Sequence, residues 1–247
     1  MVAKSKIKLV QSLKLKKYRQ KYNLFVAEGE KIMQSLLKQK KYQIREIYAM
    51  GQWLEQHSYL KDSYDLQQVD KSGMKSLSSF RSLPPVLSVV DIPHFENDIT
   101  PFGKVVYLDG VQDPGNVGTI IRTAEWFGVD AVIRSEDSAD FYNPKVIQGT
   151  MGSFASIELL TLSREELLSV SSRFGVYAAD MGGMDVASIQ TPGKALLILS
   201  NEGKGLSQIL GERADHVIQI PKNPSSTSDS LNVATAAGIL IYKLFGA

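Results

Sequence analysis

The strongest constraint on the fold is a regular alternation after residue 104, where short apolar runs recur between segments of helical periodicity. This alternation predicts βαβ units, and strands that are apolar on both faces predict a parallel sheet covered by helices on either side. Ligands bind at the carboxyl ends of the strands in such sheets. We therefore look for chemistry in the loops that follow residues 108, 199 and 220. The expected strands span residues 105–108, 131–133, 157–160, 176–179, 195–199 and 217–220.

The first ninety residues predict a second, smaller α/β domain. Helices are expected at 14–20 and 31–38, and strands at 24–27, 44–50 and 86–90. The segment that follows, with Pro93 and Pro101, shows neither period and is typical of a connection between domains. We expect an N-terminal domain over residues 1–92, a linker over 93–103 and a C-terminal domain over 104–247.

The composition excludes several classes of protein. With 43% hydrophobic residues the chain can bury a core, and no run approaches the roughly 18 apolar residues of a membrane span. The N-terminus lacks the apolar segment of a signal peptide, so we expect a cytoplasmic protein. No cysteine is present, which excludes disulfides and thiolate metal sites. His57, His94 and His216 lack the spacing of metal ligands, and we expect no metal.

Positive charge is concentrated at the N-terminal end. Residues 1–41 hold twelve lysines and arginines against Glu28 and Glu30, although the whole chain has a net charge of only +2. Such a segment is typical of an arm that neutralises RNA phosphates. A solvated helix face or a disordered tail is the alternative interpretation. The candidate RNA-binding residues are Lys14, Lys16, Lys17, Arg19, Lys21 and Lys31.

The first loop, residues 109–122, leads into a helix. Asp113-Pro114-Gly115 turns the chain, and we expect Asn116 to cap the helix. Asn116, Thr119, Arg122 and Trp126 are spaced by three or four residues and therefore share one face. An asparagine and an arginine on the first turns of a helix suit an anionic or hydroxylated substrate. A capped helix with one solvated arginine is the alternative.

The second loop reads Leu199-Ser200-Asn201-Glu202-Gly203-Lys204-Gly205-Leu206. Its glycines permit positive φ angles and close approach of a flat ligand to the backbone. The G-x-G-x-x-G fingerprint follows none of the expected strands, and the P-loop pattern is also absent. A nucleotide-dependent oxidoreductase or NTPase is therefore disfavoured. An ordinary strand–helix turn remains the alternative for this loop.

The third loop, residues 220–234, is rich in serine. We expect Asp229 or Ser230 to cap a final helix that is apolar nearly all round from Leu231 through Leu240 and hence buried. Ser230 and Asn232 would then place polar groups where core packing has no use for them. Simple capping is the alternative for Ser230.

Taken together and in this order, the loops resemble the three signature motifs of the SpoU/TrmH-type RNA 2′-O-ribose methyltransferases of the SPOUT class. The first is Asp113-Pro-Gly-Asn116-x-Gly118-x-x-x-Arg122-x-Ala124, the second Asn201-Glu202-Gly203-x-Gly205-Leu206, and the third Ile220-Pro221 followed by Ser230-Leu231-Asn232-Val233. Residues 143–153 resemble the family's intervening segment. Phe25-Val26-Ala27-Glu28-Gly29 is similar to the L30e-like substrate-binding domain often fused to this class.

The resemblance implies a fold and a site that periodicity does not. It implies a SPOUT-type C-terminal domain with a deep trefoil knot, a homodimer, and S-adenosylmethionine as the cofactor. Arg122 corresponds to the family's catalytic arginine, with Asn116, Glu202, Ser230 and Asn232 orienting it and shaping the site. The cofactor would contact Leu199, Ser200, Asn201, Gly203, Ile220 and Leu231.

The chain departs from the family pattern at three places. Ser200 stands where the second motif usually has glycine, Lys222 and a longer insertion follow Ile220-Pro221, and Ala234 stands where serine is frequent. The implied activity is methyl transfer to a ribose 2′-hydroxyl of rRNA or tRNA. The alternative is an RNA-binding protein whose methyltransferase-like domain is catalytically inactive.

Overall fold

The computed structural model describes residues 2–94, 98–190, 193–201, 203 and 205–246. These residues form two compact units. The first unit contains 2–94 together with 142–156, and the second contains the described residues of 98–141 and 157–246. The chain therefore leaves the second unit after residue 141 and returns to it at residue 157.

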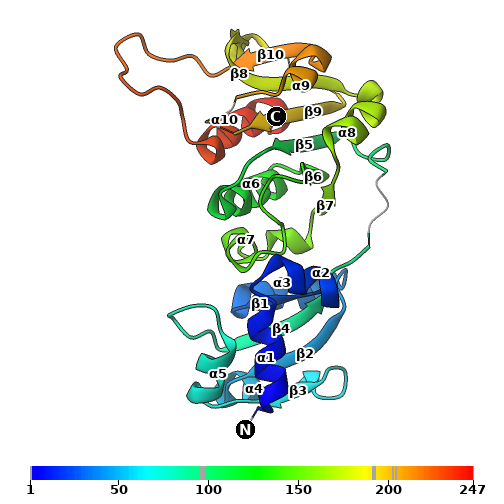
Figure 1. Cartoon of the computed structure of the whole chain (residues 1–247), viewed down its shortest axis with the longest axis vertical. Helices are drawn as coiled ribbons and strands as arrows, with labels where there is room; N and C mark the ends of the chain where they lie inside the picture. The colour runs from blue at the N-terminus through cyan, green and yellow to red at the C-terminus, as the bar shows by residue number, and fades with distance from the viewer. Residues whose placement is uncertain (1, 95–97, 191–192, 202, 204, 247) are drawn as a thin grey trace. The chain divides into compact units, whose positions relative to one another are not determined.

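The first unit is a mixed four-stranded sheet with helices on both faces (Figure 1). Strand order is β1-β4-β2-β3; β4 is antiparallel to β1 and β2, and β3 is parallel to β2. The strands are β1 (Leu24–Glu28), β2 (Ile44–Ala49), β3 (Leu66–Gln68) and β4 (Val86–Asp91). The helices are α1 (Lys4–Ser12), α2 (Lys16–Tyr22), α3 (Glu30–Gln39), α4 (Gly51–Gln56), the 3-10 turn η1 (Ser58–Leu60) and α5 (Lys71–Leu77).

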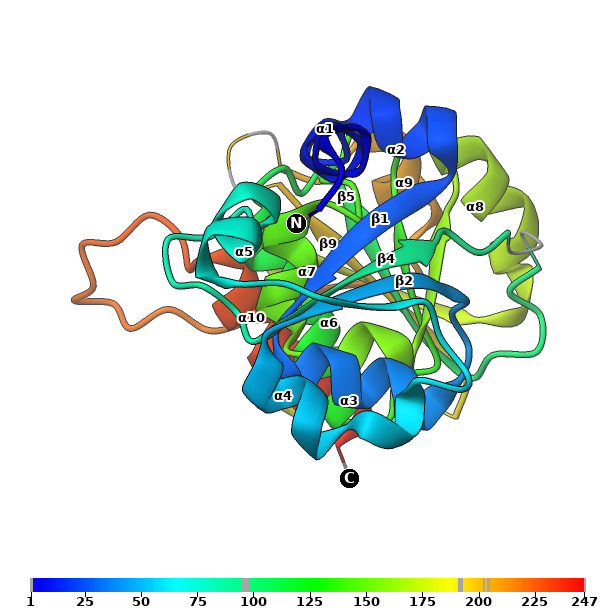
Figure 2. The same ribbon diagram turned by 90° about the horizontal axis from the view of Figure 1, so that it is seen from below.

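Alternate residues of β2 serve two separate apolar clusters. Tyr48 packs with Val10 of α1 and Met74 of α5, whereas its neighbour Ile47 packs with Met33 of α3. Successive side chains of a strand point to opposite faces, which explains the division. Figure 2 shows the sheet between α1 and α5 on one side and α3 and α4 on the other.

Residues 142–156 complete the first unit, although the expected domain division assigns them to the C-terminal domain. They form α7 (Pro144–Thr150) and the 3-10 turn η2 (Ser153–Ala155). Tyr142 and Phe154 join Phe25 and Tyr42 in an aromatic cluster, with ring centroids 4.8 Å apart for Phe25–Tyr142 and 5.2 Å for Tyr42–Phe154. Tilted and edge-on rings at such distances attract one another beyond their burial of apolar area.

The second unit is the predicted parallel sheet, and all six of its expected strands are confirmed. Strand order is β10-β8-β9-β5-β6-β7, and every neighbouring pair is parallel. The strands are β5 (Lys104–Asp109), β6 (Ala131–Arg134), β7 (Glu158–Thr161), β8 (Gly175–Asp185), β9 (Ala195–Ser200) and β10 (His216–Gln219). The helices are α6 (Pro114–Trp126), α8 (Arg164–Val170), α9 (Gln208–Arg213) and α10 (Val233–Phe245), with 3-10 turns η3 (Ser171–Arg173) and η4 (Val186–Ser188).

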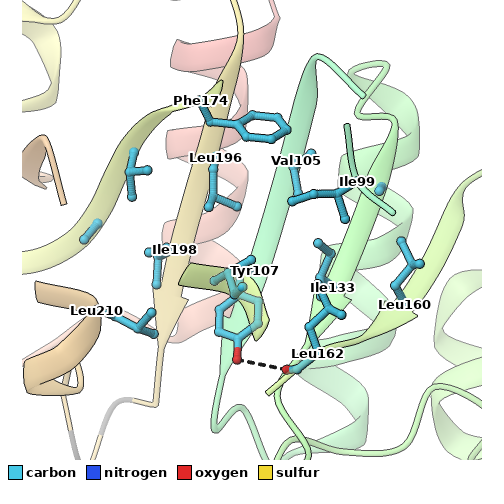
Figure 3. Close-up of a cluster of buried hydrophobic side chains, with 14 residues drawn as sticks. Ile99, Val105, Tyr107, Ile133, Leu160, Leu162, Phe174, Leu196, Ile198 and Leu210 are labelled. Carbon is cyan, nitrogen blue, oxygen red and sulfur yellow. Dashed lines mark hydrogen bonds between the residues drawn. The ribbon is translucent and has the colours of Figure 1, made fainter. Parts of the chain in front are cut away.

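Helices bury both faces of this sheet, as its apolar strands predict. On one face Tyr107 and Ile198 pack in a cluster with Leu210 of α9 (Figure 3). Leu167 of α8 belongs to the same cluster. The Tyr107 hydroxyl donates to the carbonyl of Leu162 at 3.2 Å, so the one polar group of this ring is satisfied inside the core. The opposite face is covered by α6 and α10 (Figure 1).

Two helices begin at residues other than the expected caps. The helix α6 begins at Pro114, and the carboxylate of Asp113, not the side chain of Asn116, accepts from the first turn, at 2.8 Å from the Asn116 nitrogen. Proline suits the first helical position because it lacks the N–H that would be unpaired there. The helix α10 begins at Val233 and is capped by Asn232, not by Asp229 or Ser230.

A close backbone contact between β8 and β10 requires glycine at position 183. A Cβ atom there would lie 2.5 Å from the carbonyl oxygen of Val217 and 2.7 Å from the nitrogen of Ile218. The register of the two strands shifts at this point.

We predict that Gly183→Ala lowers the free energy of unfolding by about 1–3 kcal/mol, because two backbone segments would have to move apart. Denaturant unfolding followed by circular dichroism measures the change. Gly193→Ala is the matched control, since apart from its chain neighbours no atom of the described residues lies within 4 Å of its Cβ position. Equal midpoints for the two variants would contradict the explanation.

Candidate active site

A cavity of about 430 Å³ lies in the second unit, beside the middle of β8 and the carboxyl ends of β9 and β10. Its walls come from residues 179–181 of β8, from the loops after β9 and β10 and from the first turns of α10. Five of the six expected cofactor residues line it: Leu199, Ser200, Asn201, Ile220 and Leu231. Gly203, the sixth, is absent from the lining, but its backbone N–H donates to the Asn201 side chain at 2.8 Å.

Asn201 holds the shape of the second loop. Its backbone N–H donates to the Asp109 carbonyl at 3.1 Å, and its side-chain amide donates to the Gly110 carbonyl at 2.9 Å. Its own carbonyl accepts from Gly205, which takes a φ of 68°. The left-handed conformation at Gly205 is one that a larger residue adopts only with strain. The glycine expected to allow close approach is therefore required by the backbone itself.

The third loop is exposed along residues 221–232 and extends away from the sheet between β10 and α10 (Figure 1). A local turn orders part of it, because the Asn223 side chain accepts from the Ser225 nitrogen at 2.9 Å and from its hydroxyl at 2.7 Å. Ser230 lines the cavity, as does Asp229. The longer insertion thus forms part of the cavity wall.

The first and third loops meet through two asparagines. The Asn232 amide donates to the Asn116 side-chain oxygen at 3.0 Å, while the Asn232 oxygen accepts from the Ala234 nitrogen and caps α10. This contact joins the beginnings of α6 and α10. Two residues 116 positions apart in the chain are therefore adjacent at the site.

Arg122 lies outside the cavity lining, two turns along α6 on its exposed face. It shares that face with Thr119 and with Trp126, whose side chain is 80% exposed. The structure thus confirms the predicted common face but does not bring Arg122 to the cavity of its own chain. Glu202, the remaining expected site residue, lies outside the described residues.

Five of the six expected RNA-binding cations are exposed on the first unit: Lys14, Lys16, Lys17, Lys21 and Lys31. The expectation for Arg19 is corrected, because this residue is only 2% exposed. Its guanidinium donates to the carbonyls of Leu13 and Lys14 at 2.8 and 2.9 Å. Its charge holds the turn between α1 and α2. Sequence reasoning counted the charge but had no signal for its burial.

An ion cluster that the sequence reasoning missed lies behind the second loop. Arg164, the first residue of α8, contacts the carboxylates of Asp109 and Asp137. A hydrogen bond from Ser135, together with Arg164, holds the pKa of Asp137 below its usual value. Burial lowers the pKa of Arg164, but the bonds to Asp137 and Asp109 outweigh it and the pKa is raised. Only the parallel topology brings these residues together.

The described part of the chain shows neither a cluster of metal ligands nor a membrane-spanning helix. No group of three or more histidine, aspartate or glutamate side chains there is placed to hold a metal ion. None of the described helices has the length and apolar character to cross a membrane.

Comparison with known proteins identifies the family to which the chain is similar. The SpoU rRNA Methylase family matches residues 103–242, and the MRM3-like substrate binding domain matches residues 4–85. The 23S rRNA (guanosine(2553)-2′-O)-methyltransferase RlmP of Bacillus subtilis is 30% identical over 244 residues, which cover 98% of this chain and 96% of the relative.

Two solved structures are similar over nearly the whole chain. A TrmH-family protein from Porphyromonas gingivalis has a TM-score of 0.89 at 32% identity, covering 98% of both chains. An AdoMet-bound rRNA methyltransferase from Sinorhizobium meliloti has a TM-score of 0.88 at 26% identity, covering 98% of this chain and 95% of that one.

A parallel sheet with a cavity at the carboxyl ends of its strands defines a ligand-binding α/β protein. The match to the SpoU rRNA Methylase family covers more than half of the chain and identifies the family within this class. This chain belongs to the SpoU rRNA methylase family.

Proposed function

We propose that this chain uses S-adenosylmethionine to methylate a ribose 2′-hydroxyl of RNA. The observation that carries the proposal is the cavity, because it is formed by the second and third motifs whose residues were expected to hold the cofactor. Its size lies within the usual range of roughly 300–1,000 Å³ for small-molecule sites. Ribosomal RNA is the favoured substrate, since the Bacillus subtilis relative is named as a 23S rRNA methyltransferase.

The residues of the cavity suit the cofactor. Leu199, Ile220 and Leu231 offer apolar surface to the adenine ring, and Ser200 and Asn201 offer polar groups at the strand end. S-Adenosylmethionine supplies an electrophilic methyl group on a positively charged sulfur. Two carboxylates, of Asp180 and Asp229, line the cavity against one ammonium group, of Lys222, so the lining carries a net negative charge that favours a positively charged ligand.

Transfer requires a weakly acidic hydroxyl to attack along the line of the bond that breaks. We assign Arg122 to the acceptor, where its guanidinium either stabilises the developing alkoxide or holds the adjoining phosphate. Asn116 and Asn232, joined by their hydrogen bond, keep the beginnings of α6 and α10 together. Ser230 and Glu202 complete the assigned site, and their place in the second and third motifs supports the assignment.

We predict that Arg122→Ala lowers kcat for RNA methylation by about 100-fold or more, because the charge at the reacting oxygen would be lost. Radiolabelled methyl transfer to total RNA measures the rate, and calorimetry measures cofactor binding, which should be unchanged because Arg122 lies outside the cavity. Arg173→Ala removes an exposed arginine elsewhere in the second unit and is the control. Near-normal methylation by the Arg122 variant would overturn its assignment.

The same calorimetry separates the alternative function. An RNA-binding protein with an inactive methyltransferase-like domain would bind RNA but not S-adenosylmethionine. The cavity favours the enzyme, since a chain that had lost its cofactor would not need to keep it open. Absence of cofactor binding by the folded wild-type protein would favour the inactive module.

We further propose that the first unit binds the RNA substrate. Its exposed lysines lie on α1, α2 and the turn between them, with Lys31 on α3. Tyr18 and Tyr22 stack on α2 with ring centroids 6.2 Å apart, and Tyr22 is 42% exposed. Exposed aromatic rings between lysines suit unpaired nucleotides, which stack on the rings while the ammonium groups contact phosphates.

We predict that replacing Lys16, Lys17 and Lys21 together by alanine weakens RNA binding and reduces its salt dependence. Each lost phosphate contact lowers the slope of log K against log salt by about 0.7 on a single strand, or about 2 for the three. Lys14 is left in place because it interacts with the buried carboxylate of Glu28.

The matched control replaces Lys61, Lys71 and Lys75, which are equally exposed on the first unit. Filter binding over a range of salt concentrations measures both variants. If the two sets of substitutions change the slope by the same amount, the effect is one of total charge and the assigned surface is wrong.

We also propose that the protein is a homodimer and that α6 and α10 form its interface. Trp126, Ile239 and Tyr242 are exposed by 80%, 40% and 62%, and the Tyr242 ring lies 5.6 Å from that of Phe127. Large exposed apolar surfaces mark interaction sites. A second copy is the favoured occupant, because Arg122 shares the α6 face with Trp126 and would be carried toward the partner's cavity.

We predict that Trp126→Glu weakens dimerisation about thirtyfold or more, the effect of losing a central aromatic side chain worth about 2 kcal/mol. Sedimentation equilibrium measures the association of both proteins. Tyr59→Glu, at a 67% exposed tyrosine of the first unit, should leave association unchanged. A wild-type protein that sediments as a monomer would rule out the proposed interface.

Two remaining assignments rest on the family. We propose that the segments after β9 and β10 are threaded as the deep trefoil knot of the SPOUT class. We propose the cytoplasm as the location, where ribosomal RNA is available to a bacterial-type enzyme.

A further inference from the structure

The buried carboxylate of Asp109 is the centre of a network of ion pairs and hydrogen bonds in the second unit. Asp109 ends β5 and its side chain is only 3% exposed. Arg164 contacts its Oδ1 atom through Nε at 2.6 Å and through Nη2 at 2.5 Å. The same Nη2 atom lies 3.1 Å from Asp137 Oδ2.

Asp109 also holds both ends of the second loop. Its backbone carbonyl accepts from the Asn201 nitrogen at 3.1 Å, and its Oδ2 atom accepts from the Ser207 nitrogen at 3.4 Å. The next carbonyl, of Gly110, accepts from the Asn201 side chain at 2.9 Å. The loop that carries the second motif therefore begins and ends on one short segment of β5 and the first loop.

Arg164 decides whether this arrangement is stable. A carboxylate that is taken out of water needs a cation or several donors, and the loss of its partner leaves an uncompensated buried charge. Without the guanidinium, the Asp109 carboxylate would turn toward water. That movement would break the Ser207 contact and release one end of the second loop.

We propose that Arg164 is a positioning residue for cofactor binding: through Asp109 it fixes Asn201 and Ser207, the described residues at the two ends of the second loop. Arg164 is absent from the cavity lining, so it acts through Asp109 and not by touching the cofactor. The inference rests on the proposed function, because it assigns this loop to S-adenosylmethionine. It adds a residue from α8, which belongs to none of the three motifs.

The chain offers a matched control in Arg213. Its guanidinium also pairs with an aspartate, Asp215, at 3.2 Å and donates to the Ser171 carbonyl at 3.0 Å. The two arginines are similarly exposed, 31% for Arg164 and 26% for Arg213, and both belong to the second unit. The described contacts of Arg213 do not reach the second loop.

The experiment compares Arg164→Ala, Arg164→Lys and Arg213→Ala in the full-length protein. Calorimetry with S-adenosylmethionine should show binding weakened about tenfold or more in Arg164→Ala, because the buried carboxylate loses its partner. RNA affinity should be unchanged. Arg164→Lys keeps the charge but not the fork of donors, and should restore part of the affinity.

A second measurement does not depend on the cofactor. Hydrogen exchange of the peptide that contains Asn201 and Ser207 should accelerate in Arg164→Ala and not in Arg213→Ala. If Arg164→Ala fails to fold, the double variant Arg164→Ala/Asp109→Asn removes the buried charge and should fold with partly restored exchange protection.

The outcomes separate this proposal from the proposed function. Wild-type protein that binds no S-adenosylmethionine contradicts the function, while faster exchange in Arg164→Ala would still support positioning of the loop. Equal cofactor affinity and equal exchange in Arg164→Ala and wild type would overturn the role of Arg164. Equal losses of cofactor affinity in Arg164→Ala and Arg213→Ala would also overturn it, since the loss of any ion pair in the second unit would then weaken cofactor binding.

Discussion

The parallel pairing of β5 with β9 is the contact on which the second unit depends. It places Asp109 opposite Ser200 and lets the Asn201 side chain reach the Gly110 carbonyl, 91 residues away in the chain. Parallel neighbours cannot be joined by a tight turn, so each connection must cross the sheet as a helix or a long loop. Those crossings cover both faces and leave the carboxyl ends of the strands as the place where polar residues gather.

The same parallel pairing explains which parts of the site are polar and which are apolar. The strand residues beneath the cavity, such as Leu199 and Ile218, are buried between helix layers. Polar groups appear where the strands end and the backbone must turn, because unpaired N–H and C=O groups need partners there. The Asn201 and Asn232 side chains each bind a backbone group of this kind, and the bond from Asn232 to the Asn116 side chain joins two loops that are distant in sequence.

Much of the fold could be predicted because its signals are local. Apolar runs at regular spacing predicted the six strands of the second unit, and the five lysines of the basic N-terminal segment that were expected to contact RNA are all exposed. Helix beginnings were predicted less well. Asp113 and Asn116 both suit a cap, as do Asp229, Ser230 and Asn232, so local preference alone does not choose among them. In the first unit, α1, α4, β3 and α5 lacked a strong enough period to be expected.

Charge, in particular, carried little information about burial. Arg19 lies among lysines in sequence, yet its guanidinium closes a turn inside the first unit. Residues 142–156 lie in sequence between two stretches of the second unit, yet they belong to the first, where their aromatic rings pack with Phe25 and Tyr42. By itself, the order of residues determined the strand and helix pattern, the three motifs and the family. Only the tertiary structure decided which of the motif residues meet, that Arg122 lies away from the cavity of its own chain, and that Arg164 pairs with Asp109. The reason is that these contacts join segments far apart in the chain and depend on the order of the strands in the sheet.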